Sequence, residues 1–284
     1  MVASLAAGAH AASAQRAAKA GMCPAMAPSD KSGYTFLHPT PPELMREMST
    51  DRPDQTESPY TVDAGHVQVE MTVFGAALDR ADGVRSEEFT FGSTNLKFGL
   101  LNTVDIQFVH DAWITSRTRE SGNTERVSDS GDLTTRLKIN LLGNDEGATA
   151  FALMPYVKFP LGGSAFRNGE TESGLIAILG FELPGGWGSA IMAEADFVAD
   201  ESGGYDTEYF LTATASHDLT AKLGCYVEVA SLLRPDSGED WQGQFDFGFT
   251  YAVTDNLQLD LGCNFGITDA APDYSPFVGF SARF

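Results

Sequence analysis

Leu257-Gln258-Leu259-Asp260-Leu261-Gly262-Cys263-Asn264-Phe265-Gly266-Ile267 is the stretch that decides the fold. Its odd-numbered positions are all apolar, and its even-numbered positions are polar or glycine. Successive residues of a β-strand point to opposite faces, so one face of this segment is wholly apolar. The pattern predicts a strand that separates two different environments.

The same two-residue period extends back along the chain to about Gly65. Residues 241–251 carry it just before the first stretch, and Thr254-Asp255-Asn256 supplies the turn between the two. Further segments with this pattern are 65–73, 86–101, 104–116, 133–141, 151–159, 173–183, 191–197, 205–216, 220–233 and 275–284. Together they predict about twelve strands, an even number as in bacterial single-chain barrels.

The connections between the predicted strands fall into two length classes. Short ones such as Asn102-Thr103 and Gly185-Gly186 alternate with longer polar ones near 79–86, 117–131, 163–172, 200–204, 234–240 and 268–275. A transmembrane barrel has short turns at one end and longer loops at the other. The sorting therefore favours a membrane barrel over a soluble sandwich.

The two faces of the predicted strands differ in a way that suits a membrane barrel. The polar faces carry charges of both signs interleaved with glycine, as in a wet lumen. The apolar faces carry more large side chains than a two-layer core would pack. Residues 65–284 are therefore predicted to form an all-β, antiparallel transmembrane β-barrel in a bacterial outer membrane, in contact with its lipid. A soluble β-barrel ligand binder stays open as an alternative, because it shows the same alternation.

Composition argues against several other classes of protein. The chain has 18 basic and 39 acidic residues, a formal net charge of -21, which repels nucleic acid. It has no run of about 18 apolar residues, as a transmembrane helix requires. Cys23, Cys225 and Cys263 match no metal-ligand spacing, so no metal or cofactor is expected. His110 and Asp111 face opposite sides of a strand and no Gly-x-Ser-x-Gly motif occurs, so no enzymatic activity is expected.

The N-terminal part of the chain lacks the strand pattern. Residues 1–50 are expected to be an export-signal remnant and a disordered leader, with Ala12-Ser13-Ala14 resembling a cleavage site. A plain disordered tail is the alternative. Residues 51–64 are expected to form a separate segment before the barrel.

A distinctive motif occupies that segment: Asp51-Arg52-Pro53-Asp54-Gln55-Thr56-Glu57-Ser58-Pro59-Tyr60-Thr61-Val62, continued by Gly65-His66-Val67-Gln68-Val69-Glu70. It resembles the start of an outer-membrane transporter family named for the meta-pathway of phenol degradation. Residues 131–138 and 154–162 fit the same family, so the resemblance covers residues 50–284. It implies a pore-like barrel that moves hydrophobic or aromatic small molecules.

Arg52 and its acidic neighbours Asp51, Asp54 and Glu57 are candidates for a plug. On this interpretation the segment folds into the barrel, where Arg52 pairs with a lumen carboxylate such as Glu70 or Glu194. The alternative is a solvated periplasmic leader that merely caps the barrel end.

Charged residues on the predicted lumen face are further candidates. Arg136, Lys138 and Lys158 oppose an acidic set that includes Glu194 and Asp196. They create a transverse field that orients a solute, or they neutralise one another and only stabilise the wall, as mixed charges do in most barrel interiors.

The aromatic residues near strand ends predict an interfacial belt: Trp187, Trp241, Tyr205 and Tyr251, joined by Phe277 and Phe284. The final segment places Phe280 and Phe284 on one face of an alternating strand. It resembles the signal that outer-membrane barrels present to the barrel-assembly machinery.

These features together predict an outer-membrane, porin-like transporter that passes small, hydrophobic or aromatic solutes through a charged lumen. A plugged barrel with a structural or adhesive role is the second possibility, and the soluble ligand binder is the third.

Overall fold

The computed structural model describes residues 30–81, 83–167, 169–200, 202–236 and 240–284. The chain divides into two units, Met1–Gly33 and Tyr34–Phe284. Of the first unit only residues 30–33 are described, and there the Ser32 backbone N–H donates to the Asp30 carboxylate (2.9 Å). The predicted export-signal remnant and Cys23 lie outside the described residues.

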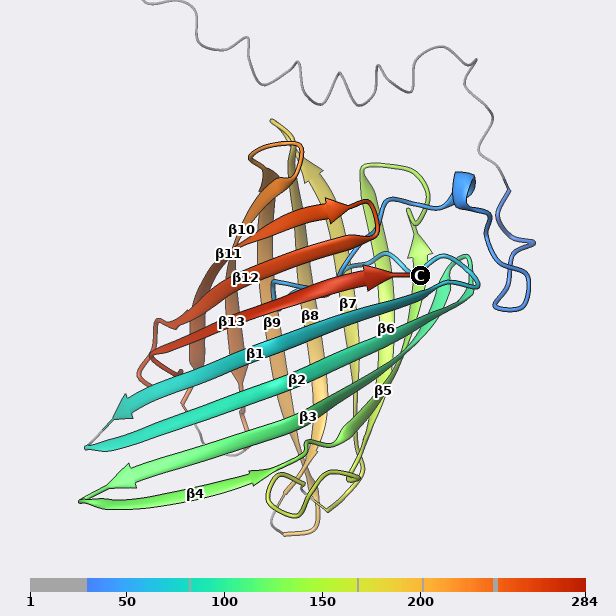
Figure 1. Ribbon diagram of the computed structural model, residues 1–284. Helices are drawn as coiled ribbons and strands as arrows, with labels where there is room; N and C mark the ends of the chain where they lie inside the picture. Colours follow the sequence, from blue (N-terminus) through green and yellow to red (C-terminus); the bar gives the residue numbers. More distant parts are fainter. Residues whose placement is uncertain (1–29, 82, 168, 201, 237–239) are drawn as a thin grey trace, which may run out of the picture. The chain divides into compact units, whose positions relative to one another are not determined.

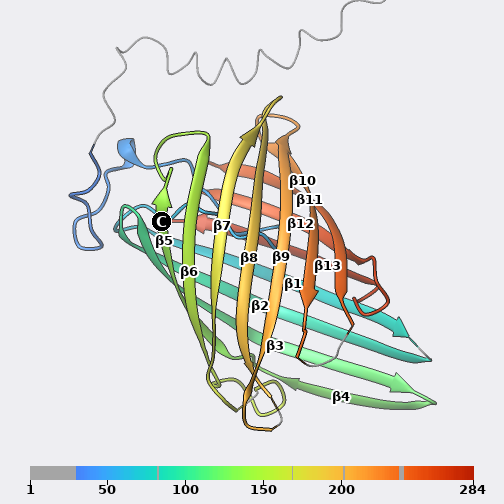
Figure 2. The same cartoon turned by 180° about the vertical axis from the view of Figure 1, so that it is seen from behind.

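The second unit is built almost entirely from β-strands, as Figure 1 and Figure 2 show. Among the described residues, one 3-10 turn, Pro42–Leu44, precedes them. The strands are β1 (Val67–Ala81), β2 (Val84–Leu101), β3 (Val104–Glu120), β4 (Asn123–Asp129), β5 (Leu133–Leu142), β6 (Thr149–Phe159), β7 (Glu172–Leu183), β8 (Trp187–Ala199), β9 (Tyr205–Asp218), β10 (Leu223–Leu233), β11 (Gln242–Thr254), β12 (Leu257–Gly266) and β13 (Tyr274–Arg283).

The strands pair antiparallel with their neighbours, and the sheet closes on itself. β1 pairs with both β2 and β13, and β2 also pairs with β3. β5 lies along the first half of β3 and β4 along its second half, so these two strands share one position in the wall. The wall therefore has twelve positions, and the predicted antiparallel barrel is confirmed.

The alternation sorts the side chains as the sequence predicts. On β12, Leu259 and Leu261 are 47% and 54% exposed on the outside, while Asp260 between them is 3% exposed on the inside. The outside of the other strands is also apolar, with exposed Phe91, Trp113, Leu175, Ile191, Leu211, Val229, Phe247 and Val278. An apolar surface around the wall, with buried charges inside, is the arrangement of a barrel that stands in hydrocarbon.

Two connections that were predicted to be long are tight turns instead. β1 continues to Ala81 and β2 begins at Val84, while β3 continues to Glu120 and β4 begins at Asn123. Ser121 and Gly122 form the second turn with φ angles of 48° and 83°. The predicted loops at 79–86 and 117–131 are therefore the tips of two long hairpins, which project side by side from one end of the barrel (Figure 1).

Candidate functional site: a segment inserted in the lumen

The barrel interior is crossed by a piece of chain without regular secondary structure. Residues 46–63, called the inserted segment from here on, contact side chains of strands on opposite sides of the wall. Their partners include Glu70 on β1, Lys138 on β5, Glu228 on β10 and Asp260 on β12. Contacts in all these directions place the segment across the lumen rather than at its rim.

Asp51 anchors one side of the inserted segment. Its carboxylate forms ion pairs with Lys97 on β2 and with Lys138 on β5, the latter at 2.6 Å. Glu70 on β1 also pairs with Lys97 and accepts a hydrogen bond from the Asp51 backbone N–H (3.0 Å). All four side chains are buried, and removing one member of such a buried pair costs about 3–5 kcal/mol because it leaves an uncompensated charge.

Arg52 anchors the adjacent part of the wall, formed by β12, β13 and β1. Its guanidinium pairs with Asp260 through two nitrogens, the shorter contact being 2.6 Å. It also donates to the Thr72 hydroxyl and lies 5.5 Å from the centre of the Phe277 ring. The partner of Arg52 is thus Asp260 and not the Glu70 or Glu194 suggested by the sequence.

The middle of the inserted segment binds the wall formed by β10 and β11. Glu228 accepts hydrogen bonds from the backbone N–H groups of Gln55 (2.7 Å) and Thr56 (2.8 Å). The Gln55 side-chain amide donates to Asp246 (2.6 Å). Asp54 lies within electrostatic reach of Glu228, so two carboxyl groups face each other here.

Glu57 contacts the part of the wall formed by β5 and β8. Its carboxylate pairs with Arg136 on β5 at 2.5 Å, and its backbone N–H points at the Met192 sulfur on β8 (3.4 Å). Beyond Glu57, Asn140 donates to the Pro59 carbonyl (2.9 Å). The β5 residues Arg136, Lys138 and Asn140 therefore all hold the inserted segment.

Both ends of the inserted segment are fixed where the chain passes the short turns. Arg46 pairs with Asp145 in the β5–β6 turn (2.9 Å) and with Asp63 (3.4 Å). The Val62 backbone N–H donates to Asp105 on β3 (3.0 Å). Gly99 on β2 allows this close passage, because a Cβ there would lie 2.0 Å from the Asp63 carbonyl oxygen.

The other predicted lumen charges form pairs within the wall. Lys158 pairs with Glu172 on the neighbouring strand at 2.8 Å, and its side chain is 34% exposed. Asp196 accepts a hydrogen bond from the Tyr156 hydroxyl, and Glu194 lies within electrostatic reach of Arg136. The basic side chains therefore have acidic partners, in the wall or on the inserted segment.

Two cavities lie beside the inserted segment. One of about 440 Å³ is bordered by Arg52, Pro53, Thr56 and Tyr60 together with residues of β8–β10 near the short turns. Another of about 330 Å³ is bordered by Arg52, Pro53 and Gln55 together with residues of β1, β2 and β13. Arg52 and Pro53 line both cavities, so the inserted segment forms the partition between them.

One part of the lumen wall is apolar, which the polar-face prediction did not include. Ala152 and Met154 on β6, Ile176 and Ile178 on β7, and Met192 on β8 form a buried cluster, with Tyr156 and Phe210 packed against it. We call these five buried residues the lumen apolar cluster. Glu57 contacts it through Met192, and Pro59 lies against Gly180 of β7, so the inserted segment covers this side of the wall.

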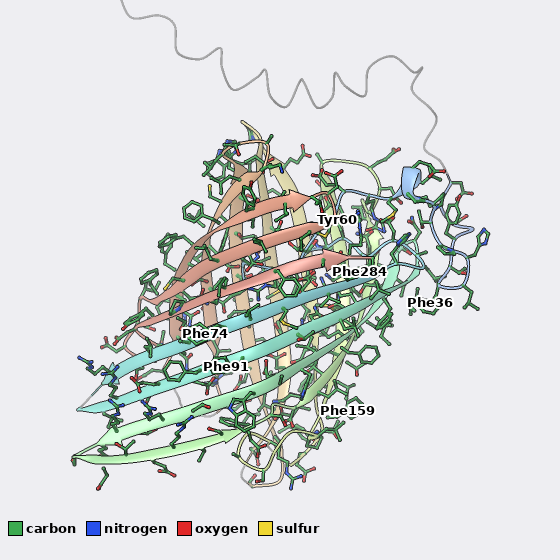
Figure 3. The ribbon with its side chains drawn as sticks, viewed as in Figure 1. Phe36, Tyr60, Phe74, Phe91, Phe159 and Phe284 are labelled. Carbon is green, nitrogen blue, oxygen red and sulfur yellow. The ribbon has the colours of Figure 1, made fainter. Side chains whose placement is uncertain are left out.

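The aromatic residues at strand ends lie at both ends of the barrel. Trp187 and Tyr251 are exposed at the short-turn end, and Tyr205 and Trp241 are exposed at the opposite end. Phe277 does not belong to such a belt, because its ring faces Arg52 in the lumen. Phe284 is 74% exposed beside the C-terminus (Figure 3), and Phe280 shares its face.

Several residues of the site were not predicted as site residues, notably Arg46, Lys97, Asp105, Gln55 and Thr56. The lumen position of Lys97 was predictable from the sequence, because Lys97 lies between the apolar residues Leu96 and Phe98 in an alternating segment. Within the described residues, no group of three metal-ligating side chains is present. Over the same residues, no helix is both long and apolar enough for a membrane span.

Comparison with known proteins identifies the family. Residues 50–284 match the family described as "Putative MetA-pathway of phenol degradation". The chain belongs to this family. The match begins at the inserted segment and runs through β13, so the segment and the barrel are parts of one family unit.

Solved structures of outer-membrane proteins share this fold. An outer membrane channel from Pseudomonas putida F1 matches with a TM-score of 0.61 at 14% identity, over 83% of this chain and 100% of that one. The β domain of a Bordetella autotransporter, BrkA, matches with a TM-score of 0.50 at 11% identity, over 77% of this chain and 99% of that one. A comparison with curated protein sequences gives no match.

Proposed function

We propose that this family member is a bacterial outer-membrane channel for small hydrophobic or aromatic molecules, with the inserted segment as its plug. The observation that carries the proposal is the partition of the lumen. A barrel with an apolar exterior encloses two cavities, and a segment held by ion pairs separates them. A solute crosses when this segment leaves its docked position.

The location follows from the exterior of the barrel. The outward aliphatic and aromatic side chains require lipid around them. The first strand begins and the last strand ends at the short-turn end, where Phe284 bonds Val67 and Arg283 bonds Asn256, and this end faces the periplasm in such barrels. A soluble ligand binder would have to expose this whole surface to water, which argues against that alternative.

The substrate class is supported by what the inserted segment covers. When the segment is displaced, the lumen apolar cluster becomes exposed to the passage. A strip of Met and Ile side chains favours apolar solutes over sugars, because burying apolar surface gains about 25 cal/mol per Å². The family's name refers to phenol degradation, and the protein of similar fold from Pseudomonas putida F1 is an outer membrane channel.

The proposed channel passes its solutes without enzymatic activity and without a cofactor.

We further propose that Phe280 and Phe284 are recognised by the barrel-assembly machinery. Phe280 lies on the outward face of β13 and the exposed Phe284 directly follows this strand, so a partner can reach both before the barrel meets lipid.

The plug is tested by two matched substitutions in the inserted segment. Asp51→Asn removes the charge that compensates Lys97 and Lys138, and this loss of about 3–5 kcal/mol raises the ratio of displaced to docked segment about 100-fold or more. Asp54→Asn replaces a carboxyl group that faces Glu228 with a neutral amide of the same size, so it leaves the docked position in place. Planar-bilayer conductance should rise in the first variant and stay at or below the wild-type level in the second.

The substrate class has its own measurement in the same bilayers. An aromatic alcohol added to one chamber should block the current of Asp51→Asn transiently, and a sugar of similar size should not. Equal conductance in both variants would remove the plug role and favour a permanently closed structural or adhesive barrel. Equal block by the sugar would remove the preference for aromatic solutes.

A further inference from the structure

The two long hairpins β1–β2 and β3–β4 carry a row of arginines across their tips. Arg80 pairs in register with Arg85, and Arg85 with Arg119. In the next row of the same face, Arg117 pairs with Arg126 on one side and with Glu87 on the other. Directly opposed side chains of paired strands lie on the same face and within contact range, so these charges form one cluster.

The strand alternation separates the two signs of charge at these tips. Glu88 and Thr90 line a lumen cavity, so the alternate residues of β2, Glu87 and Arg85, point outward. The arginine cluster therefore lies on the outer face of the wall. Most carboxylates of the same hairpins occupy the alternate, inner positions: Asp79, Glu88, Glu120, Glu125 and Asp129.

One described carboxylate is present among the arginines on the outer face. Glu87 contacts Arg85 at 2.5 Å, Arg117 at 3.4 Å and Arg119 at 3.8 Å. Arg80 and Arg126 are exposed and have no ion pair among the residues that the structure describes. A cationic surplus at this one place is notable in a chain with a net charge of -21.

The tips also enclose a hollow between the two turns. It has a volume of about 320 Å³ and is lined by three arginines, one carboxylate and four small or apolar residues: Arg80, Arg85, Arg119, Glu120, Gly83, Val84, Ser121 and Gly122. Arginine guanidinium groups around a hollow match an anion with several oxygens, because each guanidinium can donate two parallel hydrogen bonds.

The residues around the arginine cluster indicate its level relative to the membrane. The exposed apolar side chains of Phe91 and Trp113 lie on the same face, four residues farther from the tips than Glu87 and Arg117, and Figure 3 shows Phe74 and Phe91 on this front wall. β4 pairs with β3 along one edge, and in the described residues its other edge has no strand partner. Lipid tails cannot satisfy such an edge, so the tips stand at the level of the headgroups.

We propose that this outer face binds phosphorylated headgroups of the lipid in the outer leaflet. The tips lie at the end opposite the short turns, which is the end that faces out of the cell. Acyl chains then contact Phe91 and Trp113, while phosphate groups meet Arg80, Arg85 and Arg119. The proposal requires the membrane location but not the passage of solutes.

The test measures binding of a bisphosphorylated outer-leaflet glycolipid to the full-length protein in detergent, by native mass spectrometry. Arg80→Gln and Arg126→Gln, each alone, should weaken binding about fivefold, which corresponds to about 1 kcal/mol for one basic residue near an anionic lipid surface. The matched control is Lys222→Gln, which removes an exposed cation at the short-turn end and should leave binding unchanged. The same glycolipid after phosphatase treatment should bind as weakly to the wild type as to the variants.

Three results would overturn the proposal: unchanged binding in both arginine variants, an equal loss in Lys222→Gln, or tight binding of the dephosphorylated lipid. Inorganic phosphate at millimolar concentration should not displace the glycolipid, and complete displacement would mean that the cluster binds free phosphate instead. Both arginines are remote from the inserted segment, so the conductance of these variants should equal that of the wild type. A failure here therefore leaves the channel proposal untouched.

Discussion

At the residue scale, the site depends on close approaches between the inserted segment and the wall. Gly279 on β13 is the clearest case, since a Cβ there would lie against the Arg52 guanidinium and the Met71 carbonyl oxygen. Entry of Arg52 into the lumen was one of the two interpretations that the sequence left open. The sequence could not identify Asp260 as its partner, because the two are 208 positions apart and meet only through closure of the barrel.

Gly279→Ala should therefore disturb the docked position of Arg52. Overpacking of this kind costs about 1–3 kcal/mol, and the carbonyl of Met71 cannot move aside as a side chain would. The expected result is a lower unfolding midpoint and a higher conductance. Gly75→Ala is the control, because the nearest atom to its Cβ would be the Thr72 methyl group at an ordinary 3.4 Å. Similar conductance in both variants would contradict the assignment of Arg52 as an anchor.

At the element scale, most strands were predictable, and the failures have physical reasons. β12 contacts lipid on one face and a wet lumen on the other, so its residues alternate. β4 has the sequence Asn-Thr-Glu-Arg-Val-Ser-Asp, which is polar on both faces apart from Val127 because the strand stands outside the hydrocarbon, so its pattern predicts a loop. The second half of β1 was missed because its register shifts between Thr72 and Phe74, which breaks the alternation.

β7 explains why the lumen apolar cluster was not predicted. Its core, Leu175-Ile176-Ala177-Ile178-Leu179, is apolar on both faces, so the period of two disappears there. Such a run is equally compatible with any strand that is buried on both sides. The structure resolves the ambiguity, since Ile176 and Ile178 point into the lumen and Leu175 is 45% exposed outside.

A charge on the outer face of β12 should be far more costly than one on its inner face. Leu261→Arg places a guanidinium at the middle of the strand in lipid, with an expected loss of about 2–4 kcal/mol. Asn264→Arg points into the lumen, toward the wall position of Asp246, and should cost much less. Urea titration of the protein folded into lipid vesicles measures both. Equal losses would contradict the orientation of this strand.

At the scale of the whole molecule, closure of the twelve-position wall should be visible without any functional assay. The unheated protein should migrate faster on a detergent gel than the boiled protein, because the closed barrel is more compact than the unfolded chain. It should also partition into the detergent-rich phase, given its apolar exterior. Monodisperse behaviour in plain buffer would contradict the membrane location and every conclusion drawn from it.

The inserted segment has a kinetic consequence that comes from its covalent position. It ends at Asp63, and β1 begins only a few residues later at Val67. The inserted segment therefore stays covalently attached to the barrel wall after it leaves its docked position. Reclosure is then a first-order event whose rate does not depend on protein concentration. A short tether maintains an effective concentration in the millimolar range, which a detached peptide of the same sequence would have to reach before it could compete.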